Sequence, residues 1–330
     1  MKILVTGAAG FIGSHVVDAL LNRNHEVIGL DNLSNGKKEN LSEASSNSKF
    51  TFMEGDIRDQ KTCKEATKVD TVLHLACLGV RHSIHSPYEN HEVNAEGTLK
   101  ILEAAKTNEV KKFFYISTSE VYGKTVNFPI QEKDPTLPLT VYGASKLAGE
   151  HYTNAFNECY GMDTTVFRIF NNYGPRAHYE GDCGEIIPRS IVKILYGESP
   201  IIFGDGSITR DFFYVKDTAQ TLCNLLEVKN LTGKTFNIGT GEEITMKHLI
   251  EKLIQFMPEY DAQIKYLDDR PADVPRLWVD NSKLQQIYAL KDLMTFDEGL
   301  KTTISFYKEL SKQKSLVSEI KDLNWEKQPS

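Results

Sequence analysis

Short apolar runs alternate with helical segments along the first half of this 330-residue chain. Six runs have the length and apolar content of buried strands: residues 2–6, 26–30, 50–53, 71–75, 112–116 and 164–170. Between and after them, apolar residues recur with the three-to-four-residue spacing of helices, as in residues 92–108. Strands and helices that alternate in this way predict an α/β fold, in which helices cover both faces of a parallel sheet.

The alternation stops in the second half of the chain, where Pro and Gly become frequent. We therefore expect residues 1–170 to form the sheet domain, joined by the strand-like segment 201–225. Residues 171–200 and 226–330 are expected to form a smaller, mixed C-terminal lobe. Within this lobe, residues 310–330 are charged and end beside a proline, which predicts a loosely held tail.

A glycine-rich turn follows the first strand directly. Gly7, Gly10 and Gly13 stand in G-x-x-G-x-x-G spacing, and a helical apolar pattern begins within the turn. Glycines let the backbone approach a pyrophosphate, and the helix dipole favours its charge. The second strand ends in Asp31, whose carboxylate can bind the ribose hydroxyls of adenosine and would repel a 2′-phosphate. This pattern predicts a doubly wound, Rossmann-type domain that binds NAD rather than NADP.

Composition and charge argue against several other classes of protein. The net charge of −7 at pH 7 speaks against a nucleic-acid-binding protein, which would carry a basic stripe. The five cysteines never stand in C-x-x-C spacing, which predicts reduced thiols and a cytoplasmic protein. No stretch approaches the roughly 18 consecutive apolar residues of a membrane span. His82, His85 and His91 lack a helical H-x-x-x-H pair, so we expect no metal site.

Tyr142 and Lys146 stand four residues apart in a stretch expected to be helical, so they share one face. A nearby cation favours the phenolate and lowers the pKa of a tyrosine from about 10. Tyr142 is therefore a candidate general base for a sugar hydroxyl. The alternative is an ordinary aromatic residue beside a solvated lysine. The strand at 112–116 brings the segment from Ser117 to Glu120 to the sheet end where ligands of such sheets bind.

Further short motifs recur in a fixed order along the chain. They are GAAGFIG at 7–13, GDIRD at 55–59, LHLA at 73–76, STSEVYG at 117–123, YGASK at 142–146, FNNYGPR at 170–176 and GDGSITRDF at 204–212. Over about residues 1–300 the chain thereby resembles the extended short-chain dehydrogenase/reductase family, the NAD-dependent nucleotide-sugar epimerases and dehydratases.

The resemblance implies roles for many individual residues. NAD would be bound by Gly7, Gly10, Phe11, Ile12, Gly13, Asp31, Asn32, Asp56, Ile57, Leu75, Ala76, Asn94, Ser117, Tyr142 and Lys146. Tyr142 would remove the proton of a sugar hydroxyl, Lys146 would bind the nicotinamide ribose, and Thr118 would steady the alkoxide. The substrate would meet Ser83 near the sugar, and Asn171, Arg210 and Arg270 at the diphosphate, with Arg176 and Arg276 as alternatives.

Glu120 decides between the reactions of this family. A 4-epimerase only has to turn over the 4-keto sugar, whereas a 4,6-dehydratase must also remove the proton at carbon 5 and expel the hydroxyl at carbon 6. A carboxylate at position 120, beside Ser119, is well placed for this second acid/base step. We therefore expect a 4,6-dehydratase that acts on an NDP-hexose, with a UDP-sugar as the expected substrate.

Other functions stay open from the sequence. A UDP-glucose 4-epimerase-like enzyme and a UDP-glucuronate decarboxylase are the enzyme alternatives, and a catalytically silent NAD-binding regulator is the alternative outside the enzymes. Glu120 itself could instead cap the next turn or pair with a lysine. Members of the family usually dimerise through two helices per subunit. Here these would be the helices near 92–108 and 142–160, so we expect a homodimer.

Overall fold

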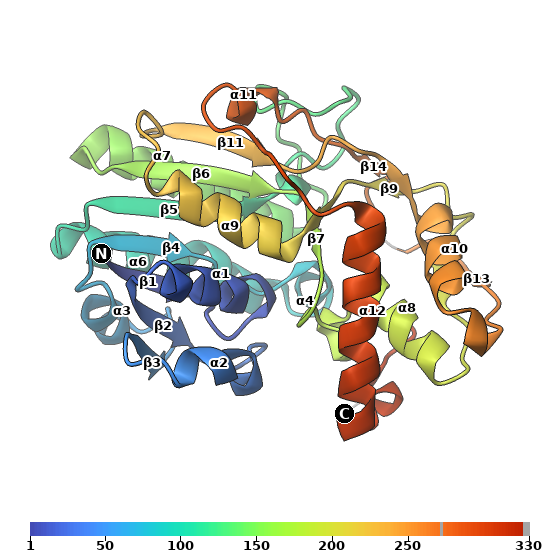
Figure 1. Ribbon diagram of the computed structural model, residues 1–330. Helices are drawn as coiled ribbons and strands as arrows, with labels where there is room; N and C mark the ends of the chain where they lie inside the picture. Colours follow the sequence, from blue (N-terminus) through green and yellow to red (C-terminus); the bar gives the residue numbers. More distant parts are fainter. Residues whose placement is uncertain (271–272, 326–330) are drawn as a thin grey trace.

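A parallel sheet organises the computed structural model, which describes residues 1–270 and 273–325 (Figure 1). In these residues it has seven strands in the order β11-β6-β5-β4-β1-β2-β3, and each neighbouring pair is parallel. The strands are β1 (Lys2–Thr6), β2 (Glu26–Asp31), β3 (Phe50–Glu54), β4 (Thr71–His74), β5 (Lys112–Thr118), β6 (Thr164–Ile169) and β11 (Lys234–Ile238). The six strands expected from the sequence are present, which confirms the predicted α/β, doubly wound parallel fold.

The strand order reverses between β1 and β4. The chain runs outward from β1 through β2 to β3 and then returns to the other side of β1. Ligands of doubly wound sheets bind at the carboxyl ends of the strands beside such a reversal. Thr6 joins the two strand ends there, because its hydroxyl accepts hydrogen bonds of 3.1 Å from the backbone N–H groups of Leu75 and Ala76. The position of the ligand site therefore follows from the order of the strands.

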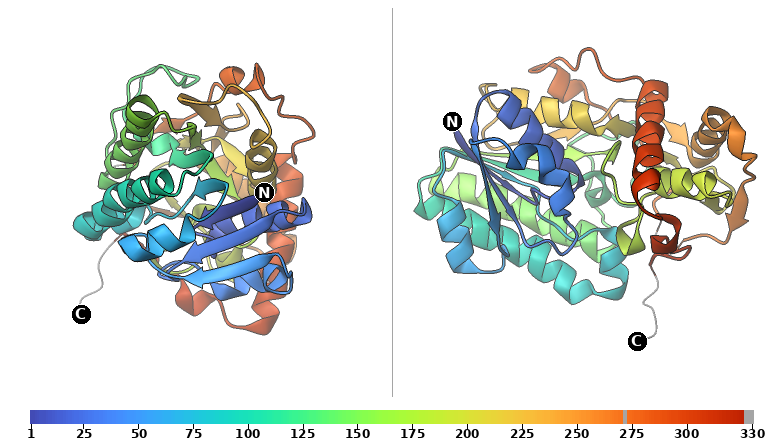
Figure 2. Two further views of the ribbon diagram at one scale, coloured as in Figure 1. Left: turned by 90° about the vertical axis from the view of Figure 1, so that its left-hand side faces the viewer. Right: turned by 60° about the horizontal axis from the view of Figure 1, so that its bottom comes forward.

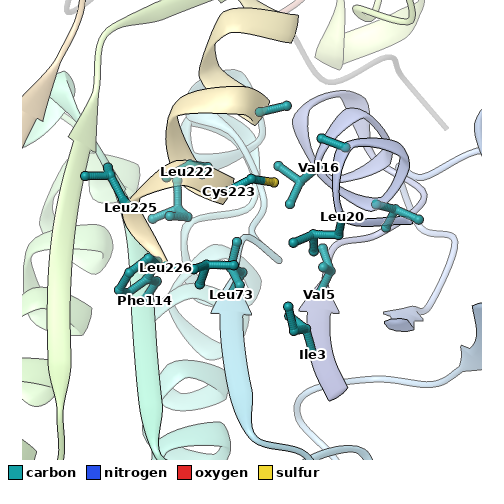
Figure 3. Packing of buried hydrophobic residues seen from close by; sticks show 14 of the residues in the cluster. Ile3, Val5, Val16, Leu20, Leu73, Phe114, Leu222, Cys223, Leu225 and Leu226 are labelled. Atoms are coloured by element: carbon teal, nitrogen blue, oxygen red, sulfur yellow. The ribbon is translucent and has the colours of Figure 1, made fainter. Parts of the chain in front are cut away.

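Two of the helices, α1 (Phe11–Asn22) and α9 (Val215–Leu225), cover one face of the sheet and lie in front of it in Figure 1. Figure 3 shows Val16 and Leu20 of α1 beside Leu222 of α9, over Leu73 and Phe114 of the strands. All five side chains are fully buried. Burying a side chain of this kind contributes roughly 1.5–3 kcal/mol, so this layer is a main source of stability for the sheet domain.

The opposite face is covered by longer segments of helix. These are α3 (Gln60–Ala66), α6 (Gly97–Thr107) and α7 (Val141–Tyr160). The expected helix at 92–108 begins with a π-helical turn, Glu92–Glu96, before α6. Helix α7 begins where the hydroxyl of Thr140 accepts a hydrogen bond of 3.1 Å from the Gly143 N–H. It ends at Gly161, which adopts the left-handed conformation with φ of +68°.

The C-terminal lobe packs three helices around its own core, at the right of Figure 1. They are α8 (Ile186–Leu195), α10 (Met246–Phe256) and α12 (Phe296–Gln313). Short strands complete the lobe: β7 (Asn171–Tyr173), β8 (Ile201–Phe203), β9 (Thr209–Arg210), β10 (Phe212–Tyr214), β12 (Ile244–Thr245), β13 (Lys265–Leu267) and β14 (Arg276–Leu277). The shorter helices of the chain are α2 (Ser42–Ser45), α4 (Val80–His85), α5 (Pro87–His91) and α11 (Ser282–Gln285). The right-hand view in Figure 2 shows the lobe beside the carboxyl ends of the large sheet.

The path of the chain differs from the expected division at two places. Strand β11 was expected in the lobe, within residues 226–330, but it is an edge strand of the large sheet and pairs with β6. Segment 201–225 is split, because β8 pairs with β13 in the lobe whereas α9 returns to the sheet. The division into two domains otherwise stays a prediction. Both differences arise because the chain crosses between the two parts more than once.

The predicted loose tail is wrong for residues 310–325. Leu316 and Asn324 are fully buried. The Arg189 guanidinium donates hydrogen bonds of 2.6 and 3.0 Å to the carbonyl oxygens of Lys321 and Asp322. The charged composition wrongly indicated a loose segment, because the segment is held largely through its backbone and its few apolar residues. Residues 326–330 lie outside the described residues.

Candidate active site

A cavity of about 380 Å³ opens at the carboxyl ends of the central strands, between the sheet and the lobe. Most of the predicted site residues line it, although they come from distant parts of the chain. They are Gly7, Gly10, Phe11, Ile12, Gly13, Asp31, Asn32, Asp56, Ile57, Leu75, Ala76, Ser117, Thr118, Ser119, Glu120, Tyr142, Lys146, Asn171, Arg210 and Arg270. The fold therefore gathers the predicted cofactor and substrate residues around one space.

Ser83 and Asn94 do not line the cavity and stand behind its wall. The buried Ser83 hydroxyl donates a hydrogen bond of 2.6 Å to the carbonyl oxygen of Val80, one turn earlier in α4. The buried Asn94 amide accepts from the Leu78 N–H at 2.8 Å and donates to the Leu78 carbonyl oxygen at 2.9 Å. Both side chains turn to the backbone that forms the wall, and their predicted contacts with substrate and cofactor stay predictions.

The glycine turn forms a cradle of closely packed backbone, in which side chains would collide with neighbouring backbone atoms. Gly7 has φ of +70°, and a β-carbon there would lie 2.9 Å from the backbone of Ala76. A β-carbon on Gly13 would lie only 2.0 Å from the Gly7 carbonyl oxygen. Helix α1 begins inside this turn, so its free N–H groups and its dipole face the cavity. The cradle is therefore suited to a phosphate group.

Two acidic residues line the part of the cavity where adenosine is predicted to bind. The carboxylate of Asp31 accepts hydrogen bonds from the backbone N–H groups of Ala9 at 3.0 Å and Leu33 at 2.8 Å. Burial of this carboxylate raises its pKa above the usual value. Burial acts in the same direction on Asp56, but hydrogen bonds from Arg58 and Asn32 outweigh it and bring the pKa of Asp56 to about 2. Both groups are fixed acceptors at this end.

Tyr142, Lys146 and Glu150 lie on one face of α7, spaced four residues apart. The Lys146 ammonium is buried and donates a hydrogen bond of 2.6 Å to the carbonyl oxygen of Ile116. It also lies 4.3 Å from the centroid of the Tyr115 ring. These contacts hold the lysine against β5, so the helix brings Tyr142 and Lys146 to the cavity together.

The expected lowering of the Tyr142 pKa is not found in the protein alone. Burial of the phenol raises the pKa of Tyr142 well above its ordinary value, whereas its interaction with Thr118 lowers it. Burial likewise lowers the pKa of Lys146, because it disfavours the ammonium. The pKa of Tyr142 differs from the expected one because desolvation disfavours the charged form of both groups, which the spacing of the two residues does not reveal.

Beneath Tyr142 and Lys146, a set of buried polar groups fixes α7 to the sheet. We call Ser117, Tyr122, Glu150 and Arg168 the anchor cluster. The Glu150 carboxylate binds the Arg168 guanidinium at 2.7 Å and accepts a hydrogen bond of 2.5 Å from the Ser117 hydroxyl. Arg168 also donates to the Tyr122 hydroxyl at 2.9 Å. The cluster joins β5, β6 and α7, so it sets where Thr118 stands relative to Tyr142.

Glu120 reaches the cavity through a short turn that follows β5. Thr118 caps this turn, because its hydroxyl accepts a hydrogen bond of 3.2 Å from the Glu120 N–H. Burial raises the pKa of the Glu120 carboxyl, and the charge of Arg210 acts in the opposite direction. Ser119 is 3% exposed. Among the described residues, the Glu120 side chain neither caps the turn nor pairs with a lysine, in contrast to the alternative considered for it.

At the far end of the cavity, Asp273 holds both predicted phosphate-binding arginines. Its carboxylate lies 2.7 Å from Arg210 and 2.8 Å from Arg270. By contrast, Arg176 pairs with Asp18 on α1, and Arg276 pairs with Glu243. Neither of these two alternative arginines lines the cavity.

Sequence reasoning missed several charged residues of this cavity, among them Arg81 and Glu185. Both also line a smaller adjoining cavity of about 90 Å³. The buried Nε of Arg81 has no hydrogen-bond partner among the described residues. Arg81 belongs to a short helix and Glu185 precedes α8, so neither lies in a recognisable motif. Asp273 had one local signal, its position three residues after Arg270.

Metal binding and membrane insertion have no evident site in the described residues. No group of three or more His, Cys, Asp or Glu side chains is placed there to hold a metal ion. His82 and His85 belong to α4 and lie close to the carboxylates of Glu89 and Asp182, at 3.3 and 2.8 Å. Within the same residues, each helix is too short or too polar to cross a membrane.

Known proteins match the chain over most of its length. It belongs to the GDP-mannose 4,6 dehydratase family, which matches residues 4–303. A UDP-glucose 4-epimerase of Mycolicibacterium smegmatis is 34% identical over 315 residues, which cover 94% of this chain and 100% of the relative. The structure of a UDP-glucose 4-epimerase from Thermotoga maritima with UDP-glucose is 35% identical, has a TM-score of 0.88, and covers 94% of this chain and 99% of that one.

A dehydratase structure matches equally well. The dTDP-glucose 4,6-dehydratase from Streptomyces venezuelae, with NAD and TYD bound, is 30% identical, has a TM-score of 0.89, and covers 95% of this chain and 98% of that one. These matches confirm the predicted family and the predicted class of enzyme, the NAD-dependent nucleotide-sugar epimerases and dehydratases. The NAD held by this relative agrees with the cofactor predicted for the class.

Proposed function

We propose that this chain is an NDP-hexose 4,6-dehydratase, with a UDP-hexose as substrate and NAD as cofactor. The observation that carries the proposal is the carboxyl group of Glu120, which lines the same cavity as Tyr142 and Thr118. Within the described residues this half-buried carboxyl makes no ion pair. A 4-epimerase needs no second acid/base after oxidation at carbon 4, whereas an elimination across carbons 5 and 6 does.

NAD fits the glycine cradle, because Gly7, Gly10 and Gly13 line the cavity and present backbone without side chains. The N-terminus of α1 would hold the pyrophosphate, and Asp31 would hold the adenosine ribose. When bound, NAD accepts a hydride from carbon 4 of the sugar and returns it at carbon 6, so the reaction involves no net oxidation. Lys146 would bind the nicotinamide ribose.

Tyr142 would take the proton of the 4-hydroxyl, and Thr118 would donate a hydrogen bond to the alkoxide that forms. Burial disfavours the phenolate. We therefore expect Tyr142 to act as a base only in the loaded enzyme, where the charge of the cofactor joins that of Lys146. Glu120 would then exchange the proton at carbon 5, which the new ketone acidifies.

The diphosphate of the substrate would bind Arg210, Arg270 and Asn171. Both arginines already converge on one carboxylate, that of Asp273. Their planar guanidinium groups can bind phosphate oxygens in pairs. We expect a diphosphate to share them with Asp273, which would keep the two groups oriented.

Epimerisation at carbon 4 is the second candidate. It is favoured by the relatives from Mycolicibacterium smegmatis and Thermotoga maritima, which are 34% and 35% identical to this chain. Position 119 also favours it, because a serine stands beside Glu120 and supplies no second carboxylate. Decarboxylation of a UDP-glucuronate is a third and weaker candidate.

We also propose a homodimer that forms through α6 and α7. Leu99 on α6 is 40% exposed, and Val141 and Tyr160 on α7 are 39% and 56% exposed. Because α6 packs beside α7, these apolar groups can meet the same helices of a second copy. The five cysteines are free thiols in this structure, which supports a cytoplasmic location.

The experiment is incubation of the purified protein with NAD and a panel of UDP-, dTDP-, GDP- and CDP-hexoses, followed by mass spectrometry and NMR. Dehydration predicts the loss of one water and a 4-keto-6-deoxy product. A product of unchanged mass with inverted configuration at carbon 4 would mean that the protein is an epimerase. A product that has lost carbon dioxide would mean that it is a decarboxylase. Turnover of none of these sugars would favour a silent NAD-binding protein.

A further inference from the structure

The elimination proposed above needs two proton carriers, and the inference here rests on that proposed function. One proton leaves carbon 5, and the oxygen that leaves carbon 6 needs a proton. If the group that takes the proton of carbon 5 keeps it and returns it to carbon 5 at the end of the reaction, a second group must protonate the leaving oxygen. Glu120 can fill the first role. Its neighbour Ser119 carries only a hydroxyl, which is a weak proton donor near neutral pH. With Glu120 holding the proton of carbon 5, the second carrier comes from another part of the cavity.

Six carboxyl groups of the described residues line the cavity, and most of them are engaged. Four have partners: Asp31 with the N–H groups of Ala9 and Leu33, Asp56 with Arg58, Asp182 with His85 and Lys321, and Asp273 with Arg210 and Arg270. The remaining two, Glu120 and Glu185, make no ion pair and no side-chain hydrogen bond within the described part of the chain. Glu185 is thus the one further carboxyl there that is free to exchange a proton.

Glu185 occupies the position before α8, but its side chain does not cap that helix. The residue is held by its backbone instead, because its N–H donates a hydrogen bond of 2.7 Å to the carbonyl oxygen of His178. Glu185 lines both cavities, together with Arg81 and Arg270. The residue therefore borders the space for the substrate, and its carboxyl group serves no contact of the fold within the described residues.

The surroundings of Glu185 favour a carboxyl group that holds its proton. Burial raises the pKa of Glu185 above the usual value. Three basic groups face it and act in the opposite direction: Arg81 from α4, His178 from the loop before α8, and Arg270 from the loop after β13. Glu185 and Glu120 are both close enough to Tyr142 for their charges to affect the phenol. The two carboxyl groups therefore lie near the same reacting region.

We propose that Glu185 is the general acid that protonates the leaving oxygen at carbon 6. Glu120 takes the proton from carbon 5, and the electron pair of that C–H bond forms the double bond between carbons 5 and 6. The C–O bond at carbon 6 breaks, its electron pair stays with the oxygen, and the proton from Glu185 completes a molecule of water. The proton that Tyr142 has taken from the 4-hydroxyl balances the proton that Glu185 gives.

The test compares two substrates in the Glu185→Gln variant of the full-length, NAD-loaded protein. The first is the sugar nucleotide that the wild type dehydrates, and the second is its 6-deoxy-6-fluoro analogue. Fluoride leaves without protonation, so the analogue needs no general acid. We expect Glu185→Gln to lose water from the natural substrate about 100-fold more slowly or worse. The same variant should release fluoride from the analogue within a few-fold of the wild-type rate.

A second readout separates the two carboxyl groups. In deuterium oxide, Glu185→Gln should still exchange the hydrogen at carbon 5 with solvent, because oxidation and proton removal precede its step. Glu120→Gln should lose this exchange and should process neither substrate. Asp182→Asn is the matched control, since Asp182 lines the same cavity but is paired with His85 and Lys321. Asp182→Asn should lower the reaction rates with the two substrates by the same factor, or leave both rates unchanged.

Each outcome decides a different question. Wild-type protein that loses no water from any sugar would overturn the proposed function itself. If the wild type loses water from the sugar but Glu185→Gln is slowed equally on both substrates, the acid role of Glu185 is overturned and the proposed function stays in place. Full activity of Glu185→Gln on the natural sugar would do the same. Thermal unfolding and NAD binding of each variant show whether a loss comes from misfolding.

Discussion

Two groups of ionisable side chains lie near Tyr142 and Lys146, and they differ in how they are paired. In the anchor cluster, Glu150 and Arg168 bind each other at 2.7 Å with side chains 3% and 8% exposed. In the cavity, the carboxyl groups of Glu120 and Glu185 have no partner within the described residues. A paired charge fixes geometry and resists change of protonation, whereas an unpaired one remains available to a substrate. The first group positions the chemistry, and the second would perform it.

The largest expected effect comes from breaking the anchor cluster. Arg168→Met leaves the Glu150 carboxylate buried without its partner, which should lower the free energy of unfolding by about 3–5 kcal/mol. Denaturant unfolding monitored by circular dichroism measures this loss. The double variant with Glu150→Gln should recover most of it, because the uncompensated charge is gone. A loss of under about 1 kcal/mol in the single variant would mean that the pair does not hold α7.

A second, intermediate effect concerns His74, which is buried beside neutral partners. Its ring lies 2.7 Å from the Thr6 hydroxyl and 3.0 Å from the Thr98 hydroxyl. Burial lowers the pKa of His74 from 6.5 to about 3. Because the pKa of His74 is lower in the folded protein, the unfolded chain takes up the proton at a higher pH than the folded chain does. Stability is therefore full above pH 6.5 and falls as the pH drops from 6.5 toward 3, by about 2 kcal/mol at pH 5.

The measurement is the free energy of unfolding between pH 7.5 and 5 for the wild type and His74→Gln. The variant should have a shallower slope, although His15 contributes in the same direction because burial lowers its pKa to about 4. His91 is on the surface, so His91→Gln serves as the control and should leave the slope unchanged. Equal slopes in all three proteins would contradict the assignment of a neutral His74.

The smallest expected effect is on the stability of the cavity variants. Glu120→Gln and Glu185→Gln each remove a half-buried carboxyl that has no partner in the described chain, so no pair is broken. We expect the free energy of unfolding to change by less than about 1 kcal/mol, or to rise. The same denaturant curves measure it. A loss as large as that of Arg168→Met would place these carboxyl groups among the structural pairs and remove the contrast.

The cofactor end of the site could be predicted from sequence because its parts are local. The glycine turn follows β1 directly, and Asp31 ends the next strand. The substrate end is assembled from segments that are far apart, and Arg81 and Glu185 have no motif around them. Strand β11 was missed for the same reason, since it returns to the sheet after a long excursion through the lobe. The pKa of Tyr142 could not be predicted because burial depends on the whole fold.

The regular spacing of Tyr142, Lys146 and Glu150 on α7 has an evolutionary consequence. Each added residue turns an α-helix by about 100° and advances it by about 1.5 Å. A single insertion or deletion between Tyr142 and Glu150 would turn either the phenol away from the cavity or the carboxylate away from Arg168. Residues on the outward face of this segment can be substituted, but the number of residues in the segment cannot change. A descendant chain that altered this length would keep the fold only by giving up the reaction.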